Sequence, residues 1–543
     1  MIQNKMDFSM YMNKFLKFLG LIGLLAGCAT TGQDGGTWSD GYDITHVGAP
    51  NSMQYGHPMD EYGTYESDDE IRRIAVLLPT SGKNSAIGKT IQTSITTAVL
   101  EHNDKNLAVS FYDTATNANE TINEALATNP EIIIGPLFAD NARILRDTKS
   151  SDIPALSFTS DATAVGNGVM TMALMPTNSV ETIVSQMASD SIKSFIILAP
   201  NTTSGQLMAG TAKNAANIYS VPLAGLFYYN SGDANSIKEV SKTASMNVAR
   251  SAANTRAREI LSDILTNEKL TALEYSNLNM QLERISRTDT IGTIPYDAIL
   301  FLGDAEDTKK LASFMRYYGI SSHDAKYYGS ALWDGTDIAS DITMKGAKFA
   351  ALPQSNETFV TTYQTLTGTT PSRLATFGYD ATNLAIGMIK SNKSNAAYLL
   401  DPSGYVGTDG LFRLKPTGDN ERALRIVKLN GDGTTDEIRS APANFIKPIY
   451  NIEQRHISPA SMIELQSDGI NPTDYIRIPE RLAGKYSAKT YGKNKTSATT
   501  VAPTNVITVV PSDTSAPITS AEYTPVKLES VNRKYIDEIE IEE

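Results

Sequence analysis

The chain has 543 residues, of which 41% are hydrophobic and 20% are charged, and its formal net charge is -13 with a sequence pI near 5.1. This length is sufficient for two or more units with their own hydrophobic cores. Because the acidic balance leaves no basic excess to neutralise phosphates, it argues against a nucleic-acid partner and otherwise indicates only solubility.

The first 27 residues have the pattern of a secretory signal. Lys14 and Lys17 precede an apolar run, residues 18–25, that is too short to cross a bilayer as a helix. The run ends in Leu25-Ala26-Gly27-Cys28, which resembles the bacterial lipobox. That resemblance implies that the sulfur of Cys28 receives a diacylglycerol and becomes the mature N-terminus; the alternative is an ordinary signal followed by an unmodified cysteine. Cys28 is the only cysteine, so no intramolecular disulfide is expected.

A lipidated Cys28 predicts a periplasmic protein that contacts a membrane through its lipid anchor only. Ala29, and not Asp, follows the cysteine, which favours the outer membrane over the inner one. Residues 28–70 are rich in Gly, Thr, Ser and Asp without a sustained period, which predicts a flexible tether. At the other end, the polar residues 451–543 are predicted to form a largely disordered tail.

From Ile71 onward, short β-branched runs alternate with helical patterns. Residues 131–161 contain two such runs separated by a helical segment, which predicts a βαβ unit and therefore a parallel sheet. We expect strands at 74–79, 107–112, 132–134 and 153–156, with helices at 85–102, at 117–127 and after Gly135-Pro136. Strands alternating with helices in this order predict one doubly wound α/β lobe.

A second series of alternating elements follows residue 176. We expect helices at 180–188, 203–216, 307–318, 357–366 and 374–389, and strands at 195–198, 222–229, 298–302 and 327–329. Residues 235–287 are long, polar and helical. Their amphipathic spacing is expected to pack these helices on a lobe and not to form a partner surface.

Four stretches of this sequence, taken together, are specific for one type of fold. They are residues 74–88, 134–137, 153–157 and the hairpin 406–413. They resemble the type 1 periplasmic-binding fold, the class of Leu/Ile/Val-binding proteins, over about residues 71–450. The resemblance implies two lobes, each a doubly wound parallel sheet.

We assign residues 71–175 plus 350–450 to lobe 1 and residues 176–349 to lobe 2. Residues 138–143 and 331–333 add a resemblance to the branch of penicillin-binding protein activators, which are lipoproteins that stimulate peptidoglycan synthases.

In amino-acid binders of this fold, hydroxyls and backbone N–H groups at two turns of lobe 1 hold the ligand carboxylate. The resemblance implies that the corresponding candidates are Ser81, Ala139, Asp140, Ser157, Thr159, Ser160 and Asp161. Ala139 stands where the family has a hydroxyl, and Asp161 stands where it has a ligand-binding Thr. A carboxylate beside the ligand carboxylate would cost roughly 1–4 kcal/mol in a partly wet cleft, so these departures argue against free α-amino-acid binding.

In lobe 2 the resemblance implies that Ser204, before Gly205, replaces the aromatic residue that usually covers the ligand, and Thr203 is a further cleft candidate. An ammonium group could still bind Asp304, Glu306 or Asp307. Each candidate also has a structural interpretation. The hydroxyls of the 157–160 turn would satisfy backbone groups, and Asp140, Asp161 and Asp304 would cap helices. We favour capping for Asp304 and Asp307 and leave the hydroxyls open.

No motif indicates an enzyme. Residues 82–90 follow a strand as a phosphate-binding loop would, but five residues and not four separate their two glycines. The five histidines are scattered without metal-ligand spacing, and no Gly-x-Ser-x-Gly elbow is present. We therefore expect no catalysis, no metal and no cofactor.

Two functions remain. The first is a regulatory lipoprotein that docks on a peptidoglycan synthase. The second is a solute receptor that delivers amino acids or similar small polar ligands to an ABC permease, with hinge closure on the ligand.

Overall fold

The computed structural model describes residues 71–393, 395–445 and 470–487. The chain forms two units, Met1–Pro479 and Glu480–Glu543. Helix α14 (Glu480–Tyr486) belongs to the second unit, and all the other described helices and strands belong to the first. The predicted signal and tether (1–70) and most of the predicted tail lie outside the described residues.

The first sheet belongs to lobe 1 and is parallel, with strand order β2-β1-β3-β4-β5. Its strands are β1 (Arg72–Leu78), β2 (Leu107–Asp113), β3 (Ile132–Ile134), β4 (Ala155–Ser157) and β5 (Val169–Thr171). Its first three helices are α2 (Ser85–His102), α3 (Ala118–Ala127) and α4 (Ala139–Thr148). The predicted α/β alternation is confirmed.

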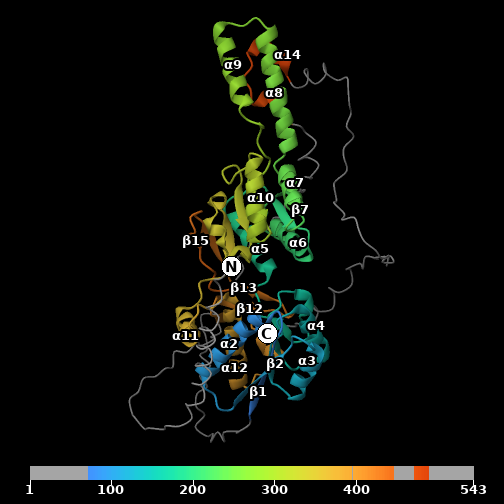
Figure 1. Ribbon diagram of the computed structural model, residues 1–543, viewed down its shortest axis with the longest axis vertical. Helices are drawn as coiled ribbons and strands as arrows, with labels where there is room; N and C mark the ends of the chain where they lie inside the picture. Colours follow the sequence, from blue (N-terminus) through green and yellow to red (C-terminus); the bar gives the residue numbers. More distant parts are fainter. Residues whose placement is uncertain (1–70, 394, 446–469, 488–543) are drawn as a thin grey trace, which may run out of the picture. The chain divides into compact units, whose positions relative to one another are not determined.

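Both faces of this sheet are covered, because successive residues of a strand point to opposite faces. Ile74 and Val76 of β1 lie in one buried cluster with Ile91 of α2. Leu77 lies in a second cluster with Leu145 of α4. Figure 1 shows α2 on one side of the sheet and α3 and α4 on the other. Burial on both faces is the reason that these strands are continuous apolar runs.

The second sheet belongs to lobe 2 and has the order β15-β14-β10-β9-β8-β6-β7. Its parallel strands are β6 (Phe195–Pro200), β7 (Leu223–Tyr229), β8 (Ala298–Phe301), β9 (Lys326–Gly329) and β10 (Lys348–Ala351). Strands β14 (Arg425–Leu429) and β15 (Thr435–Arg439) are antiparallel to their neighbours. Its helices include α5 (Pro176–Ser189), α6 (Thr203–Ile218), α7 (Ala234–Ala244) and α10 (Ala305–Tyr317).

The division between the lobes differs from our assignment of residues 350–450 to lobe 1. Strand β10 pairs with β9 of lobe 2, and β14 and β15 extend the same sheet. The chain therefore returns to lobe 1 only between β10 and β14. Sequence spacing does not show this, because a strand pairs with a partner that is distant in the chain.

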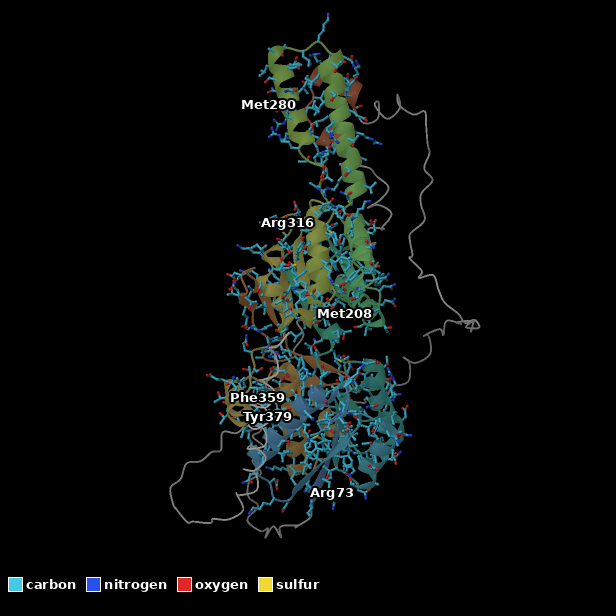
Figure 2. The ribbon with its side chains drawn as sticks, viewed as in Figure 1. Arg73, Met208, Met280, Arg316, Phe359 and Tyr379 are labelled. Carbon is cyan, nitrogen blue, oxygen red and sulfur yellow. The ribbon has the colours of Figure 1, made fainter. Side chains whose placement is uncertain are left out.

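The returning segment completes lobe 1. It contains α11 (Glu357–Thr367), α12 (Arg373–Lys390) and a small antiparallel sheet of β11 (Tyr405–Gly407), β12 (Gly410–Leu414) and β13 (Asn420–Arg422). Helix α12 packs on α2. Figure 2 shows Phe359 of α11 beside Tyr379 of α12, and their ring centroids are 4.6 Å apart. The expected hairpin at 406–413 is the β11–β12 pair.

Helices α8 (Asn247–Asn267) and α9 (Ala272–Ser286) form a helical hairpin within lobe 2. We expected these helices to pack on a lobe. Instead they pack mainly on each other, and Figure 1 shows the hairpin projecting beyond α10. Each helix has buried apolar residues, among them Ile264 of α8 and Leu278 of α9.

Part of the predicted disordered tail is ordered against this hairpin. The side chain of Gln281 on α9 accepts a hydrogen bond from the N–H of Arg477 at 2.6 Å and donates to its carbonyl at 3.1 Å. The hydroxyl of Tyr475 accepts from the N–H of Thr293 at 3.3 Å. Short 3-10 turns complete the description: η1 (Ala162–Ala164), η2 (Ala331–Trp333), η3 (Asp337–Ser340), η4 (Ile342–Met344), η5 (Ala396–Leu399) and η6 (Pro472–Asp474).

Candidate functional site

The first turn of the candidate site joins β3 to α4. Gly135 has φ 102°, and a Cβ there would lie 2.2 Å from the carbonyl oxygen of Leu77, so only glycine fits. Helix α4 then begins at Ala139, with Phe138 in the N-cap position and no side-chain cap. Our expectation that Asp140 caps this helix is wrong: its side chain is 93% exposed in the first turn.

The hydroxyls of the second turn, after β4, satisfy backbone groups. Ser157 is buried; its Oγ donates to the carbonyl of Pro136 at 2.8 Å and accepts from the N–H of Thr159 at 3.3 Å. The Oγ1 of Thr159 accepts from the N–H of Asp161 at 3.1 Å. Ser160 is exposed. These contacts agree with the structural interpretation, in which the hydroxyls of Ser157 and Thr159 satisfy backbone groups of the turn.

Asp161 lies at the end of this turn and is already bound by the protein itself. Its carboxylate accepts from the N–H and the Oγ1 of Thr163 at 2.8 and 2.7 Å, and from the guanidinium of Arg143. The hydrogen bond from the Thr163 side chain lowers the pKa of Asp161. Partial burial alone would raise this pKa, whereas the hydrogen bond from the Thr163 N–H and the interaction with Arg143 lower it further. Asp161 also caps η1, as the capping interpretation predicted.

Ser81 lies at the start of lobe 1 beside the end of β2. Its backbone N–H and that of Thr80 donate to the same oxygen of Asp113, at 3.4 and 2.9 Å. Partial burial alone would raise the pKa of Asp113. Hydrogen bonds from the Ser81 side chain and from nearby backbone N–H groups nevertheless lower it. Ser81 thus stabilises the ionised form of Asp113.

The lobe 2 candidates border a hollow of about 190 Å³ at the carboxyl ends of β6 and β8. Ser204 and Asp304 are both in its lining, which consists of Pro200, Thr202, Ser204, Gly205, Met208, Ser231, Leu302, Asp304, Asp307 and Leu332. Thr203 is exposed and is not part of the lining. Asp304 caps α10 by accepting from the N–H of Asp307 at 2.8 Å, as we favoured.

Asp307, which was also expected as a candidate for an ammonium group or as a cap, lines the hollow as well. Asp307 is 3% exposed and accepts from the Oγ of Ser231 and, at 3.2 Å, from the N–H of Gly232. Nearby, the hydroxyl of Tyr229 is buried without a hydrogen-bond partner in the described part of the chain, and burial raises the pKa of this phenol. The spacing Asp304-x-x-Asp307 was the available sequence signal, but it is also an ordinary capping pattern.

The structure therefore separates the candidates into two groups. Ala139, Asp140, Ser157, Thr159, Ser160 and Asp161 lie at the carboxyl edge of β3 and β4 in lobe 1. Ser204 and Asp304 lie at the carboxyl edge of β6 and β8, and every lining residue of the hollow comes from lobe 2. Parallel sheets place ligands at these edges, and at the lobe 1 edge the carboxylate of Asp161 is paired with Arg143.

Metal clusters and membrane-spanning helices are both absent from residues 71–393, 395–445 and 470–487. Within these ranges no group of three or more His, Cys, Asp or Glu side chains is arranged to hold a metal ion. Within the same ranges no helix combines the length and the apolar character needed to cross a bilayer.

The two sheets and the chain crossings between them define a type 1 periplasmic-binding fold. The crystal structure of a putative branched-chain amino acid ABC transporter from Rhodospirillum rubrum superposes with a TM-score of 0.52 at 16% identity, covering 68% of this chain and 99% of that one. The C-domain of LpoA from Haemophilus influenzae, a regulator of PBP1A, superposes with a TM-score of 0.45 at 17% identity and covers 67% of this chain. The predicted fold class is confirmed.

The sequence is similar to a narrower group. Residues 64–250 match the family model described as LppC putative lipoprotein. The penicillin-binding protein activator LpoA of Mannheimia succiniciproducens is 27% identical over 169 residues, which is 30% of this chain and 29% of that protein. The LpoA of Haemophilus influenzae is 25% identical over 169 residues. The matched segment thus spans under a third of these curated relatives. The predicted resemblance to penicillin-binding protein activators is confirmed as a similarity.

Proposed function

We propose that this chain is a non-enzymatic, lipid-anchored periplasmic protein that binds a peptidoglycan synthase and regulates it. The similarity of residues 64–250 to a lipoprotein family, and of 169 residues to two penicillin-binding protein activators, supports the class of function. The observation that carries the proposal is the ion pair between Arg143 and Asp161. The resemblance implies that a receptor for free amino acids uses this turn for the ligand carboxylate, and an internal carboxylate paired with Arg143 argues against that use.

The α8–α9 hairpin is the surface that best fits a protein partner. On α9 the side chains of Leu273 and Met280 are 71% and 57% exposed. They are seven positions apart, so they lie on one face of the helix. Figure 2 shows Met280 on the outside of the hairpin. Exposed apolar side chains on a projecting element are typical of contact sites between proteins.

The anchor and the flanking segments complete the proposal. Residues 1–27 are a signal peptide, Cys28 carries the lipid, and residues 28–70 are a tether that lets the two lobes reach a partner away from the membrane. The outer membrane is the proposed location. Labelling cells with a fatty-acid analogue tests the anchor: the wild-type chain should be labelled and the Cys28→Ser chain should not.

The partner is tested by photo-crosslinking in intact envelopes. A benzoylphenylalanine placed at Met280 should crosslink to a peptidoglycan synthase, identified by mass spectrometry. The control position is Leu100 of α2, which is 62% exposed and outside the hairpin. Purified full-length protein should then increase the rate of glycan synthesis or transpeptidation by the same synthase. Failure to crosslink and failure to change the rate would together reject the proposal.

A solute receptor for an ABC permease is the second candidate, because the lobe 2 hollow places the carboxylate of Asp304 at the carboxyl edge of a parallel sheet. That arrangement fits an amine or a similar small polar ligand. Calorimetry with a panel of amino acids tests it. Binding that disappears in Asp304→Asn would favour the receptor, whereas flat titrations of the wild-type chain would exclude it.

A further inference from the structure

Three segments of the chain cross between the lobes: residues 172–175, 352–356 and 423–424. An arginine side chain donates to a carbonyl in or beside each of the first two. Arg422 donates to the carbonyl of Met172, and Arg425 donates to the carbonyl of Leu352 at 2.8 Å. Because these arginines flank the third crossing, they connect all three segments to one another.

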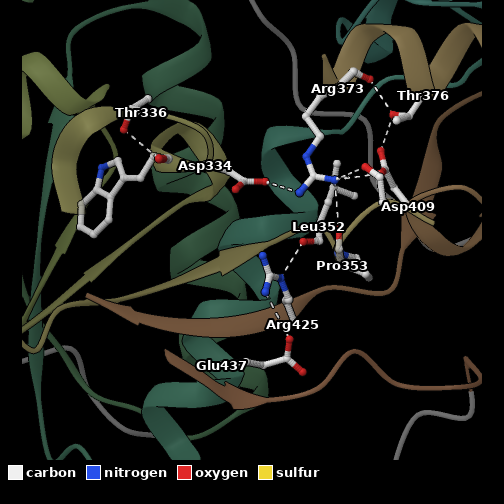
Figure 3. A network of polar contacts seen from close by, with 11 residues as sticks. Asp334, Thr336, Leu352, Pro353, Arg373, Thr376, Asp409, Arg425 and Glu437 are labelled. Atoms are coloured by element: carbon white, nitrogen blue, oxygen red, sulfur yellow. Dashed lines mark hydrogen bonds and ion pairs between the residues drawn. The ribbon is translucent and has the colours of Figure 1, made fainter. Parts of the chain in front are cut away.

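A third arginine, Arg373 at the start of α12, binds the second crossing from the lobe 1 side. Its Nη1 donates to the carbonyl of Pro353 at 2.9 Å, to the Oγ of Ser355 at 3.1 Å and to Asp409 at 2.7 Å (Figure 3). The carboxylate of Asp409 is fully buried and also accepts from Ser355 and Thr376. A buried carboxylate needs its charged partner, so Asp409 fixes Arg373 to lobe 1.

The other nitrogen of the same guanidinium reaches lobe 2. Nη2 of Arg373 donates to the carboxylate of Asp334 at 3.3 Å (Figure 3). Asp334 directly follows η2, whose Trp333 is buried against Phe349 of β10 with ring centroids 5.9 Å apart. The indole N–H of Trp333 also donates to Thr308 at 3.3 Å. Asp334 therefore moves with the core of lobe 2.

We propose that the ion pair between Arg373 and Asp334 is an interlobe latch, which holds the two lobes in one relative arrangement and must separate before the hinge can move. Arg373 keeps its buried partner Asp409 in either state, so Asp334 is the group that is released. The side chains of Arg373 and Asp334 are 32% and 17% exposed, which leaves the pair accessible to salt. Any ligand or protein that changes the angle between the lobes has to offset this contact.

The latch does not depend on which partner the protein has. It explains how a fold that closes on ligands in solute receptors can act as a fixed scaffold, and it predicts that the arrangement of the lobes depends on ionic strength.

Double electron–electron resonance on the full-length chain tests the latch. Spin labels on Asn123→Cys of α3 and Lys213→Cys of α6, both exposed, report the distance between the lobes. The background carries Cys28→Ser so that only the introduced thiols react. The test variant is Asp334→Asn, which removes the negative charge that Arg373 binds in lobe 2. The matched control is Asp337→Asn, which loses an exposed pair with Lys309 inside lobe 2.

The wild-type chain should give one dominant distance. Asp334→Asn should increase the population of other distances about two- to fivefold, the range expected for a partly exposed pair. Raising the salt concentration to about 1 M should shift the wild-type chain in the same direction, since the screening length is then about 3 Å. The control should match the wild type. Identical distributions for Asp334→Asn and wild type would overturn the proposal. If that variant does not fold, a wild-type distribution that is unchanged by salt would overturn it instead.

Discussion

The guanidinium of Arg143 on α4 is bound to the carboxylate of Asp161, at the turn where the resemblance to amino-acid binders places the ligand carboxylate. The two side chains have nearly equal exposed fractions, 36% and 37%. Asp161 supplies the negative charge that a ligand would bring, and Arg143 with Thr163 supplies the donors. The charge of Asp161 is therefore paired within the protein at this turn.

This relationship predicts a modest coupling energy. In a double-mutant cycle with Arg143→Gln and Asp161→Asn, we expect roughly 0.2–1 kcal/mol of interaction, because both side chains are partly exposed. The pKa of Asp161 is lowered, so this stabilisation is present above the unfolded value near pH 4 and is lost as the pH falls below it. Urea unfolding at pH 7 and pH 3 measures both effects. Glu124→Gln is the control, since its side chain is exposed on α3 and not on the helix of Arg143.

A second prediction concerns Asp380 of α12, which is fully buried. Burial, with a smaller effect of the nearby Asp409 charge, raises the pKa of Asp380 to about 7, although Thr408 donates to it through its N–H at 2.8 Å and through its hydroxyl. The folded protein therefore binds this proton more tightly than the unfolded chain. The resulting stabilisation is complete below about pH 4 and is lost as the pH rises through about 7.

Asp380→Asn should remove this contribution, which is on the order of 2 kcal/mol between pH 5 and pH 8. Urea midpoints at the two pH values measure it, with Asp147→Asn as an exposed control: the pKa of Asp147 is lowered, so any contribution it makes is constant between pH 5 and pH 8 and is lost only in acid. An unchanged pH slope in Asp380→Asn would show that another group causes the dependence.

A third prediction concerns the attachment of the α8–α9 hairpin. Arg250 at the start of α8 is 7% exposed and donates to the carbonyls of Tyr318 at 2.9 Å and Gly292 at 3.1 Å. Arg250→Met leaves these acceptors unsatisfied, which should cost roughly 1–3 kcal/mol. Hydrogen exchange of α8 and α9 should accelerate while that of lobe 1 stays constant. The exposed Arg256→Met on the same helix should change neither.

A fourth prediction compares two glycines of lobe 2. A Cβ on Gly329, at the end of β9, would lie 2.3 Å from the ring of Trp333, so Gly329→Ala should destabilise lobe 2 by roughly 1–3 kcal/mol. Gly210 of α6 has no atom within 4 Å of its added Cβ, so Gly210→Ala should stabilise the helix by roughly 0.5–1 kcal/mol. Thermal unfolding distinguishes them; destabilisation by both would point to the backbone and not to the Trp333 contact.

Much of the lobe 1 fold was predictable because its signals are local. Apolar runs at 74–79 and 132–134, each followed by a helix, are sufficient to predict parallel strands, and the structure contains β1 and β3 there. The capping roles of Asp161 and Asp304 were predictable for the same reason, since a cap bonds to residues two or three positions away. The prediction that Asp140 caps α4 was wrong, because Asp140 lies inside the first turn, past the N-cap position from which a side chain reaches the free N–H groups.

Contacts between distant residues were not predictable. Nothing in the sequence near Asp161 indicates that Arg143 binds it, and nothing near Asp334 indicates Arg373. The division of the lobes failed for the same reason, since β14 joins lobe 2 by pairing with β10 across many intervening residues.

The sequence by itself determined the class of protein: a two-lobed α/β fold whose strands are buried on both faces, preceded by the predicted lipid anchor. These properties follow from hydrophobic periodicity and short motifs, which act over a few residues. Only the tertiary structure decided that Arg143 pairs with Asp161 in lobe 1 and that Arg373 binds Asp334 of lobe 2. Which charged residues pair depends on which distant segments the folded core brings within hydrogen-bonding distance. The local sequence around each residue does not show this.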